Sequence, residues 1–386
     1  WGLPVLPDDK PKWFDRMFLD DWITLPQGVE KRFADFKYDR IFKSFNELAK
    51  YSQMNQFSSL KYEIERIRLA DEIKGYVITE FTDINWECNG LLDMWRNPKI
   101  FHDELSMIQN PDIIIPFVEK YNYWNTEAID IQIYFSHYGY KTLSDLKLEW
   151  FVDGEKNGEH RVSRSIKHNL ELVHSLKLES PKVNSPKKIR IRFKLIGMNN
   201  DSIAENYIEV FVYPQIVNKK PDIHITNSLD EFSINKLNEG GNVICFIDSA
   251  SVVPNDFPFN ITSRNEDWYD GNWATNLNWV ADTKPFKEMG LNKIINFEID
   301  KVIPNYIITD IPNENFDDVL SGMFVAWLYL NSGYIVQMSA GDGKLLLVTF
   351  DMYKNYDSDP FAATLLNKLS DYINSDLCKP KSQWKL

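Results

Sequence analysis

A series of segments between residues 129 and 213 alternates apolar and polar residues with a period of two, and this pattern restricts the fold more than any other feature. Successive side chains of a strand point to opposite faces, so each segment predicts a half-buried β-strand. Gly, Asn, Ser and Pro separate the segments, and this spacing is typical of a β-sandwich. The predicted strands are 129–135, 145–152, 170–178, 188–196 and 207–213.

The residues before this region follow other patterns. Apolar residues recur at helical spacing over 41–69, with Glu, Lys and Arg between them, which predicts a long amphipathic helix. The β-branched and aromatic run 75–83 predicts a buried strand. Pro98 suits the start of a short helix over 99–109. A helix followed by a buried strand is typical of an α/β unit.

The carboxyl-terminal part mixes both periods. Short apolar strands are predicted at 223–225, 242–247 and 344–350, followed by a closing helix over 361–373. The glycine pair 240–241 marks the end of a helix, because Gly adopts the positive φ found there. A chain of 386 residues is long enough for two to three domains. We predict three, over 1–110, 111–216 and 217–386, and the last has the pattern of an α/β domain.

Composition excludes some partners. The net charge is −13, which would repel phosphate backbones and anionic lipid, so we expect neither nucleic acid nor membrane as a partner. The sequence contains no apolar stretch of about 18 residues and no signal peptide, so it reads as soluble. A periplasmic or a secreted location is compatible with this pattern. The 12 Trp residues suit a sugar-binding cleft, although such residues are more often core.

Cysteine spacing gives no sign of a metal or a disulfide framework. Cys88, Cys245 and Cys378 are far apart and form no CxxC pair. We predict neither a metal site nor a cofactor.

The chain starts at Trp1 rather than Met. A removed signal peptide is one explanation, and loss of a larger upstream region is the other. An amino terminus inside the apolar run 1–7 would be unusual, so we expect the second.

Three sequence motifs resemble parts of glycoside hydrolase family 2. Residues 75–93, GYVITEFTDINWECNGLLD, with RNPK at 96–99, resemble the eighth barrel strand and the loop after it. Residues 53–68 resemble the helix that precedes this strand. Residues 1–4, WGLP, resemble a segment that in one branch of the family soon follows a Ser-Glu-Phe-Gly motif at strand seven, where the Glu is the nucleophile.

The resemblance implies a mixed fold: the last part of a (β/α)8 barrel, an immunoglobulin-like β-sandwich, and an α/β domain of glutamine-amidotransferase-like, flavodoxin type. The last domain is implied by 341–347 and 359–362. Cys245 falls inside its predicted strand, whereas an active amidotransferase carries its nucleophilic Cys on a tight turn, so we expect this domain to be catalytically empty.

The implied activity is that of a retaining β-glycosidase that hydrolyses β-glycosidic bonds in oligo- or polysaccharides. Such hydrolysis needs two carboxyl groups about 5 Å apart. The resemblance puts both upstream of Trp1, so no catalytic residue is assigned here and the chain is expected to be inactive alone. Its expected partners are a carbohydrate substrate and the missing amino-terminal part or a partner chain. The alternative is a non-catalytic carbohydrate-binding or assembly module.

The predicted substrate-binding residues are Glu80, Asp83, Trp86 and Trp1, because functional groups of a barrel lie at the carboxyl ends of its strands. The carboxylates would accept hydrogen bonds from sugar hydroxyls, or orient a neighbour such as Arg96. The indoles would stack on a sugar or pack under the loop.

Other polar and aromatic residues allow two interpretations each. Asn89 either makes a turn with Gly90 or binds a cation. Three tryptophans, with acidic and amide neighbours, suggest either a second sugar site or an interface loop that docks this domain on the barrel or on a neighbouring subunit of a homo-oligomer. They are Trp268, Trp273 and Trp279.

Overall fold

A computed structural model describes residues 1–12, 14, 26–84, 86–167, 169–197, 199–216, 221–249, 252–254, 256–264 and 277–386. The chain divides into two compact units. Unit 1 comprises Trp1–Ser52, Asp83–Cys88 and Ile216–Leu386, and unit 2 comprises Gln53–Thr82 and Asn89–Gln215. The boundary falls inside helix α2 (Phe45–Leu69), the predicted long helix.

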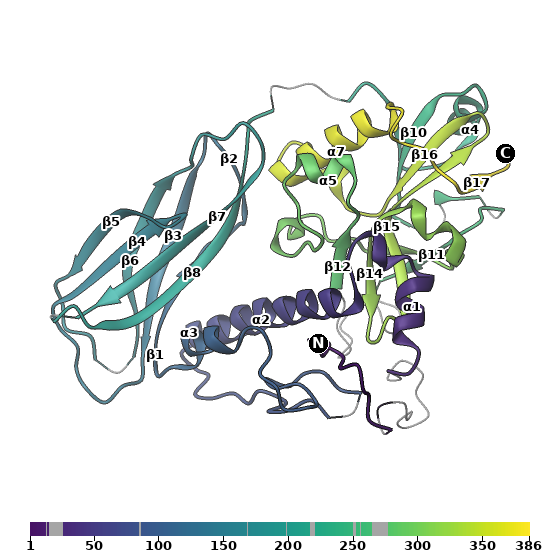
Figure 1. Ribbon diagram of the computed structural model, residues 1–386. Coiled ribbons are helices and arrows are strands. Elements are labelled where there is room, and N and C mark those ends of the chain that lie inside the picture. Colours follow the sequence, from purple (N-terminus) through teal and green to yellow (C-terminus); the bar gives the residue numbers. More distant parts are fainter. Residues whose placement is uncertain are drawn as a thin grey trace. The chain divides into compact units, whose positions relative to one another are not determined.

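Unit 2 contains the predicted β-sandwich, whose strands are drawn as two facing layers in Figure 1. The three-stranded sheet has the order β1-β3-β6, and the five-stranded sheet the order β2-β8-β7-β4-β5. In the part of unit 2 that the structure describes, β2 and β8 pair in parallel and the other pairs are antiparallel. The strands are β1 (Asp112–Phe117), β2 (Asn122–Trp124), β3 (Ala128–His137), β4 (Leu146–Val152), β5 (Glu155–Val162), β6 (Asn169–Glu179), β7 (Lys187–Ile196) and β8 (Ser202–Tyr213).

The sandwich confirms the five strands predicted over 129–213, because each prediction falls on β3, β4, β6, β7 or β8. Alternation decides which side chains enter the core: along β7, Ile189, Ile191 and Phe193 are buried and the residues between them are not. These side chains and those of the other sheet form one apolar cluster.

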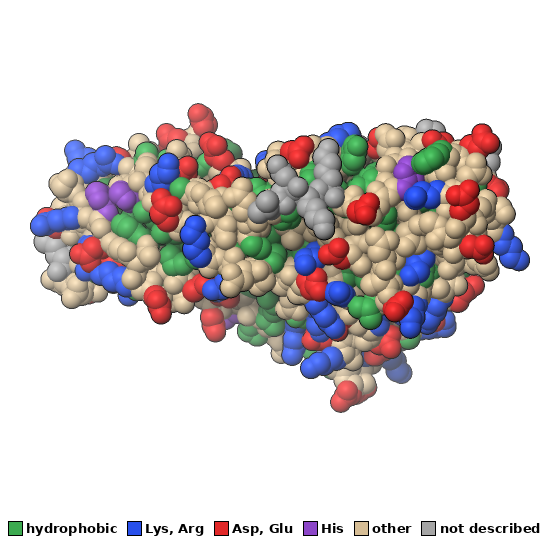
Figure 2. Space-filling view, turned by 90° about the horizontal axis from the view of Figure 1, so that it is seen from above, with side chains coloured by type: hydrophobic (Ala, Val, Ile, Leu, Met, Phe, Trp, Pro, Cys, Tyr) green, Lys and Arg blue, Asp and Glu red, His purple; other side chains and the backbone are tan. Residues whose placement is uncertain are grey.

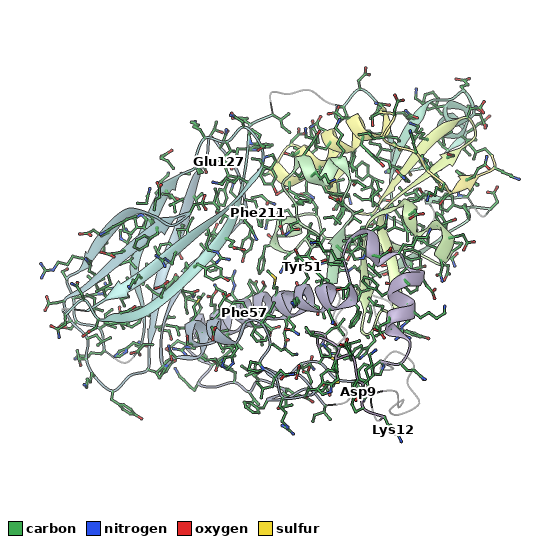
Figure 3. The ribbon with its side chains drawn as sticks, viewed as in Figure 1. Asp9, Lys12, Tyr51, Phe57, Glu127 and Phe211 are labelled. Atoms are coloured by element: carbon green, nitrogen blue, oxygen red, sulfur yellow. The ribbon has the colours of Figure 1, made fainter. Side chains whose placement is uncertain are left out.

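The second half of α2 packs on the sandwich within unit 2. Asn206, on β8, is completely buried and donates from Nδ2 to Glu65 Oε1 and to the Ile114 carbonyl, both at 2.6 Å. Arg68 donates to the Pro111 carbonyl at 2.7 Å. Phe57, labelled on α2 in Figure 3, forms a small apolar cluster with Ile64, Phe101 and Ile108. The helix predicted over 99–109 is shorter than expected, a 3-10 turn η3 (His102–Glu104) and α3 (Ser106–Gln109).

Residues 75–83, predicted as a buried strand, form no ladder. Burial alternates along them as in a strand: Tyr76 and Ile78 pack against the cluster on α2, whereas Val77 and Phe81 are 89% and 70% exposed. Backbone N–H and C=O groups of a strand need a neighbouring strand. The described residues before Asp112 contain no strand, only isolated bridges. The described residues that were predicted to end a barrel therefore form helices and loops, and the predicted strand is absent from them.

Unit 1 contains a sheet of nine strands. Its main path is β11-β13-β15-β16-β10-β9; β12 pairs with β14, β14 pairs with β15, and β17 also pairs with β15. The strands are β9 (His224–Thr226), β10 (Asn242–Phe246), β11 (Asn260–Ser263), β12 (Leu277–Val280), β13 (Tyr306–Thr309), β14 (Val319–Val325), β15 (Leu330–Ala340), β16 (Gly343–Val348) and β17 (Gln383–Trp384). The helices are α1 (Val29–Asp35), η2 (Tyr38–Arg40), the first part of α2, α4 (Glu231–Asn238), α5 (Lys284–Glu288), η5 (Phe297–Ile299), η6 (Asn313–Asp318), α6 (Met352–Asn355) and α7 (Pro360–Ile373).

This sheet differs from the doubly wound parallel sheet expected of a flavodoxin-type domain. Among the described strands of unit 1, the parallel pairs are β9–β10, β10–β16 and β15–β17. The connection from β15 to β16 is a tight turn with Gly341 at φ 55°, and a short hairpin forces its strands to be antiparallel. The predicted strands and closing helix are present, as β9, β10, β16 and α7, and Gly240 ends α4 at φ 83°.

The amino-terminal residues of unit 1 pack against its sheet. Tyr38 is completely buried and its hydroxyl donates to Asn331 Oδ1 at 2.6 Å. Arg40 Nη1 donates to the Asp317 carbonyl at 2.9 Å, and Lys293 forms an ion pair with Glu47 at 2.7 Å. Segments from the two ends of the chain therefore share one core.

Candidate functional site

Trp1 and Trp86 come from distant segments of the sequence and lie together in unit 1. Their ring centroids are 6.1 Å apart, with 35° between the planes. The backbones of the same segments are joined, because the Gly2 N–H donates to the Cys88 carbonyl at 2.9 Å. Trp1 is buried and Trp86 is half-buried, so Trp86 has the more accessible indole.

Trp86 lies in a tight turn. The N–H of Ile84 donates to the Glu87 carbonyl at 3.2 Å, and the N–H of Glu87 donates back to Ile84 at 3.0 Å. Asp83, just before the turn, is only 3% exposed. A buried carboxylate needs polar partners, so its burial favours an orienting role over direct contact with a sugar.

Trp327 contacts this turn. It was not among the residues predicted from sequence. Its indole Nε1 donates to the Trp86 carbonyl at 2.8 Å, and its side chain is completely buried. The run 323–328 is almost entirely apolar and reads as core, so no sequence signal distinguishes this residue from its neighbours.

Glu80 and Asn89, the other predicted site residues, belong to unit 2. Glu80 is half-buried. Arg96, its alternative partner, donates from Nη1 to Thr82 Oγ1 at 3.2 Å. Glu80 thus remains a candidate on position and partial exposure alone.

The Asn89-Gly90 segment is held through its backbone. Gln56 Nε2, on α2, donates to the carbonyls of Asn89 and Gly90 at 2.8 and 3.1 Å. Gln56 Oε1 accepts from Lys99 Nζ at 3.0 Å, and Lys99 is only 2% exposed. Sequence reasoning missed Gln56 and Lys99, although Lys99 belongs to the quoted motif. Much of this motif therefore stabilises the loop.

Of the three tryptophans predicted as a site in the last domain, the structure describes Trp279. Trp268 and Trp273 lie outside the described residues. Trp279 is on β12 rather than in a loop, and it is 1% exposed, with Tyr38 packed edge-on at 5.6 Å. Such burial leaves no face for a sugar or a partner, so Trp279 is a core residue.

Cys245 lies inside β10, as expected, and is completely buried. Burial raises the pKa of its thiol to about 12, so the thiolate nucleophile is disfavoured. Within the described ranges, no three His, Cys, Asp or Glu side chains are grouped to hold a metal ion. In that same part of the chain, no helix combines the length and the apolar character that crossing a bilayer requires. Acidic and basic side chains are interspersed on the face shown in Figure 2.

Comparison with known sequences gives little. Residues 329–386 match a family described as a domain of unknown function, DUF8487. No curated protein matches the chain.

Similar solved structures include glycosidases and fibronectin-like domains. A β-D-mannosidase from Dictyoglomus thermophilum is 17% identical over 55% of this chain and 27% of its own, with a TM-score of 0.36. An exo-chitosanase from Amycolatopsis orientalis is 12% identical over 44% and 20%, with a TM-score of 0.30. Fibronectin(III)-like modules from Clostridium thermocellum are 13% identical over 27% and 100%, with a TM-score of 0.20.

The chain therefore covers about a quarter or less of these two glycosidases and has only a weak fold relationship to them. Other structures at this level of similarity include a β-glucuronidase from Parabacteroides merdae and a glycosyl hydrolase family 2 member from Bacteroides cellulosilyticus.

Proposed function

We propose that this chain is the carboxyl-terminal part of a retaining β-glycosidase similar to glycoside hydrolase family 2, acting on β-glycosidic bonds of oligo- or polysaccharides. Its catalytic carboxylates belong to the sequence that precedes Trp1. The chain contributes the sugar-contacting Trp86 and needs no cofactor. The carbohydrate and the upstream part of the enzyme are its partners.

The contact between Trp1 and Trp86 carries this proposal. By resemblance, residues 1–4 follow barrel strand seven and 75–93 cover strand eight, and these strands are neighbours in a (β/α)8 barrel. The 6.1 Å between the two indole rings and the hydrogen bond from Gly2 to Cys88 support this proposal, because they bring the two segments side by side. A half-exposed indole at this position suits stacking on a sugar ring.

The test is hydrolysis of a panel of aryl β-glycosides by two proteins, the 386-residue chain and a version extended upstream through a complete barrel. Activity in the extended version alone supports the proposal and identifies the sugar. Turnover by the 386-residue chain would overturn it, since the catalytic carboxylates would then lie within this sequence.

Replacing Trp86 tests its role in the extended enzyme. Loss of a stacking indole removes about 1 kcal/mol of binding, so Trp86→Ala should raise KM about fivefold with a smaller change in kcat. Trp124→Ala, which removes another half-buried indole from β2 of the sandwich, is the matched control and should leave KM unchanged. Equal KM values for Trp86→Ala and Trp124→Ala would show that Trp86 does not contact the sugar.

The alternative is a carbohydrate-binding or assembly module without hydrolysis. It is favoured if the extended version hydrolyses none of the glycosides while the chain is retarded by a polysaccharide in an affinity gel. In that case the residue that replaces the expected upstream nucleophile should not be a carboxylate.

A further inference from the structure

The hairpin that joins β14 to β15 carries Trp327 at its tip. Ala326 and Leu328, on either side, have φ of 53° and 62°, a left-handed conformation that residues with a Cβ seldom adopt. The Tyr329 N–H donates to the Val325 carbonyl at 3.2 Å and closes the turn. The turn therefore has a specific shape that directs the completely buried Trp327 side chain inward.

The tip is fixed by the amino-terminal segment of unit 1. Arg32 Nε donates to the Trp327 carbonyl at 2.9 Å. Asn331 Nδ2 donates to the Leu328 carbonyl at 2.8 Å, and the same Asn331 side chain accepts from the Tyr38 hydroxyl. These contacts hold the main chain of the tip on both sides of the indole.

The indole ring is also held by packing. Phe45 stacks on it with centroids 6.5 Å apart and planes at 12°, and Phe14 meets it edge-on at 5.7 Å. A ring enclosed on two sides has little freedom to rotate. Its N–H group therefore points in one direction.

That N–H group donates to the Trp86 carbonyl at 2.8 Å. The acceptor belongs to the turn that presents the Trp86 indole. Two hydrogen bonds join the main chains of Ile84 and Glu87 on either side of this turn, and Ile84 is 64% exposed. The hydrogen bond from the buried Trp327 indole therefore fixes a turn that is partly exposed to solvent.

We infer that Trp327 is a positioning residue for sugar binding: its N–H fixes the Ile84–Glu87 turn so that Trp86 offers its face to a pyranose ring. This inference rests on the proposed function. It makes the carboxyl-terminal sheet part of the substrate site, with the β14–β15 hairpin as the contributing element, rather than an appended domain.

Hydrogen exchange on the 386-residue chain tests the anchor without any substrate. Trp327→Phe keeps an aromatic ring for Phe45 and Phe14 but removes the donor. Exchange should become several-fold faster in the peptide over 82–88 and stay unchanged over β15 and β16. The control is Trp384→Phe, another buried indole of unit 1, which packs on Phe257. Unchanged exchange over 82–88 in Trp327→Phe would overturn the inference, whatever the activity.

A double-variant series in the extended enzyme tests the link to the sugar. Trp327→Phe should raise KM for the aryl β-glycoside about fivefold, the effect of one lost hydrogen bond, with kcat nearly unchanged. In a Trp86→Ala background the same change should have no further effect. A KM increase that persists without Trp86 would show that Trp327 does not act through it. Absence of hydrolysis in every version, with faster exchange over 82–88, would instead reject the proposed function and with it the role in sugar binding.

Discussion

Burial alternates along the sandwich strands and along the segment 75–83, yet of these two regions the sandwich alone forms ladders among the described residues. In β7, buried and exposed residues alternate and every residue from Lys187 to Leu195 has a partner on β8. In 75–83, Tyr76 and Ile78 face the cluster on α2 while Val77 faces solvent, and no ladder forms. Alternation therefore decides which faces are apolar, and the strand itself depends on a neighbour to pair with.

The largest expected effect lies in the centre of the sandwich. Phe193 on β7 is completely buried between the sheets. Phe193→Ala should lower the free energy of unfolding by about 4 kcal/mol, because it removes a large apolar side chain and leaves a cavity. Urea denaturation followed by circular dichroism measures this, with Phe193→Leu as the milder control. A loss below about 1 kcal/mol would mean that the two sheets do not share a tight core.

A smaller effect is expected at Asp93, where a side chain, and not a neighbouring strand, accepts the hydrogen bonds of backbone N–H groups. Asp93 is 6% exposed, and its Oδ1 accepts from the N–H groups of Trp95 and Asn97 at 2.9 and 2.8 Å. Asp93→Ala leaves these donors without this acceptor and should cost about 2 kcal/mol. Asp93→Asn keeps an acceptor oxygen and should cost less. Hydrogen exchange over 91–100 locates the effect, and equal protection in both variants would contradict it.

These two regions also show what could be predicted from sequence. Five of the eight described sandwich strands were predicted, because their pairing partners are in this chain and local periodicity agrees with actual pairing, whereas β1, β2 and β5 were missed. The strand predicted at 75–83 does not form, because the β-branched and aromatic run on which it was predicted says nothing about pairing partners. In the sheet of unit 1, the sequence predicted β9, β10 and β16, which pair in parallel, but not the other described strands, whose pairs are mostly antiparallel.

The candidate site was predictable only in part. The motif residues Trp1 and Trp86 are brought together, with Trp86 the more exposed of the two, whereas Asp83 and Trp279 are buried as Trp1 is. Trp327 could not be found from sequence, because its contact with the Trp86 carbonyl joins positions 241 residues apart and uses a backbone atom. Every residue has a backbone carbonyl, so the residue type at the acceptor position does not indicate such a hydrogen bond.

The outward face of 75–83 should tolerate polar substitution in this chain. Val77 is 89% exposed, so Val77→Ser should change the free energy of unfolding by no more than about 0.5 kcal/mol. Ile78→Ser is the matched control on the packed face and should cost about 1 kcal/mol, because Ile78 contacts the cluster on α2. If Val77→Ser proves as costly as Ile78→Ser, the outward face is covered in solution by a partner strand or another chain.

The smallest expected effect lies at β5 and β6, which end the order of their sheets among the described strands. His160 on β5 and His174 on β6 stack with ring centroids 4.2 Å apart, and Trp150 stacks on His174 at 5.6 Å. Burial, and then the neighbouring His160, lowers the pKa of His174 below its usual 6.5. The unfolded chain therefore takes up this proton first as the pH falls.

The free energy of unfolding should accordingly be constant well above pH 6.5 and decrease as the pH falls from there through the lower pKa of the folded state. Because the ring is partly exposed, solvent screening limits the loss to about 0.3 kcal/mol.

Urea denaturation at pH 8 and 5 should show a slightly smaller loss in His174→Gln than in the unsubstituted chain. His102→Gln, at an exposed position on η3, is the control and should leave the loss unchanged. If His174→Gln loses as much stability as the unsubstituted chain, the acid sensitivity arises elsewhere. Glu209 does not account for a loss between pH 8 and 5: burial would raise the pKa of this carboxylate, but Lys188 and Arg190 lower it below the usual 4.5, so its contribution is lost only at more acidic pH.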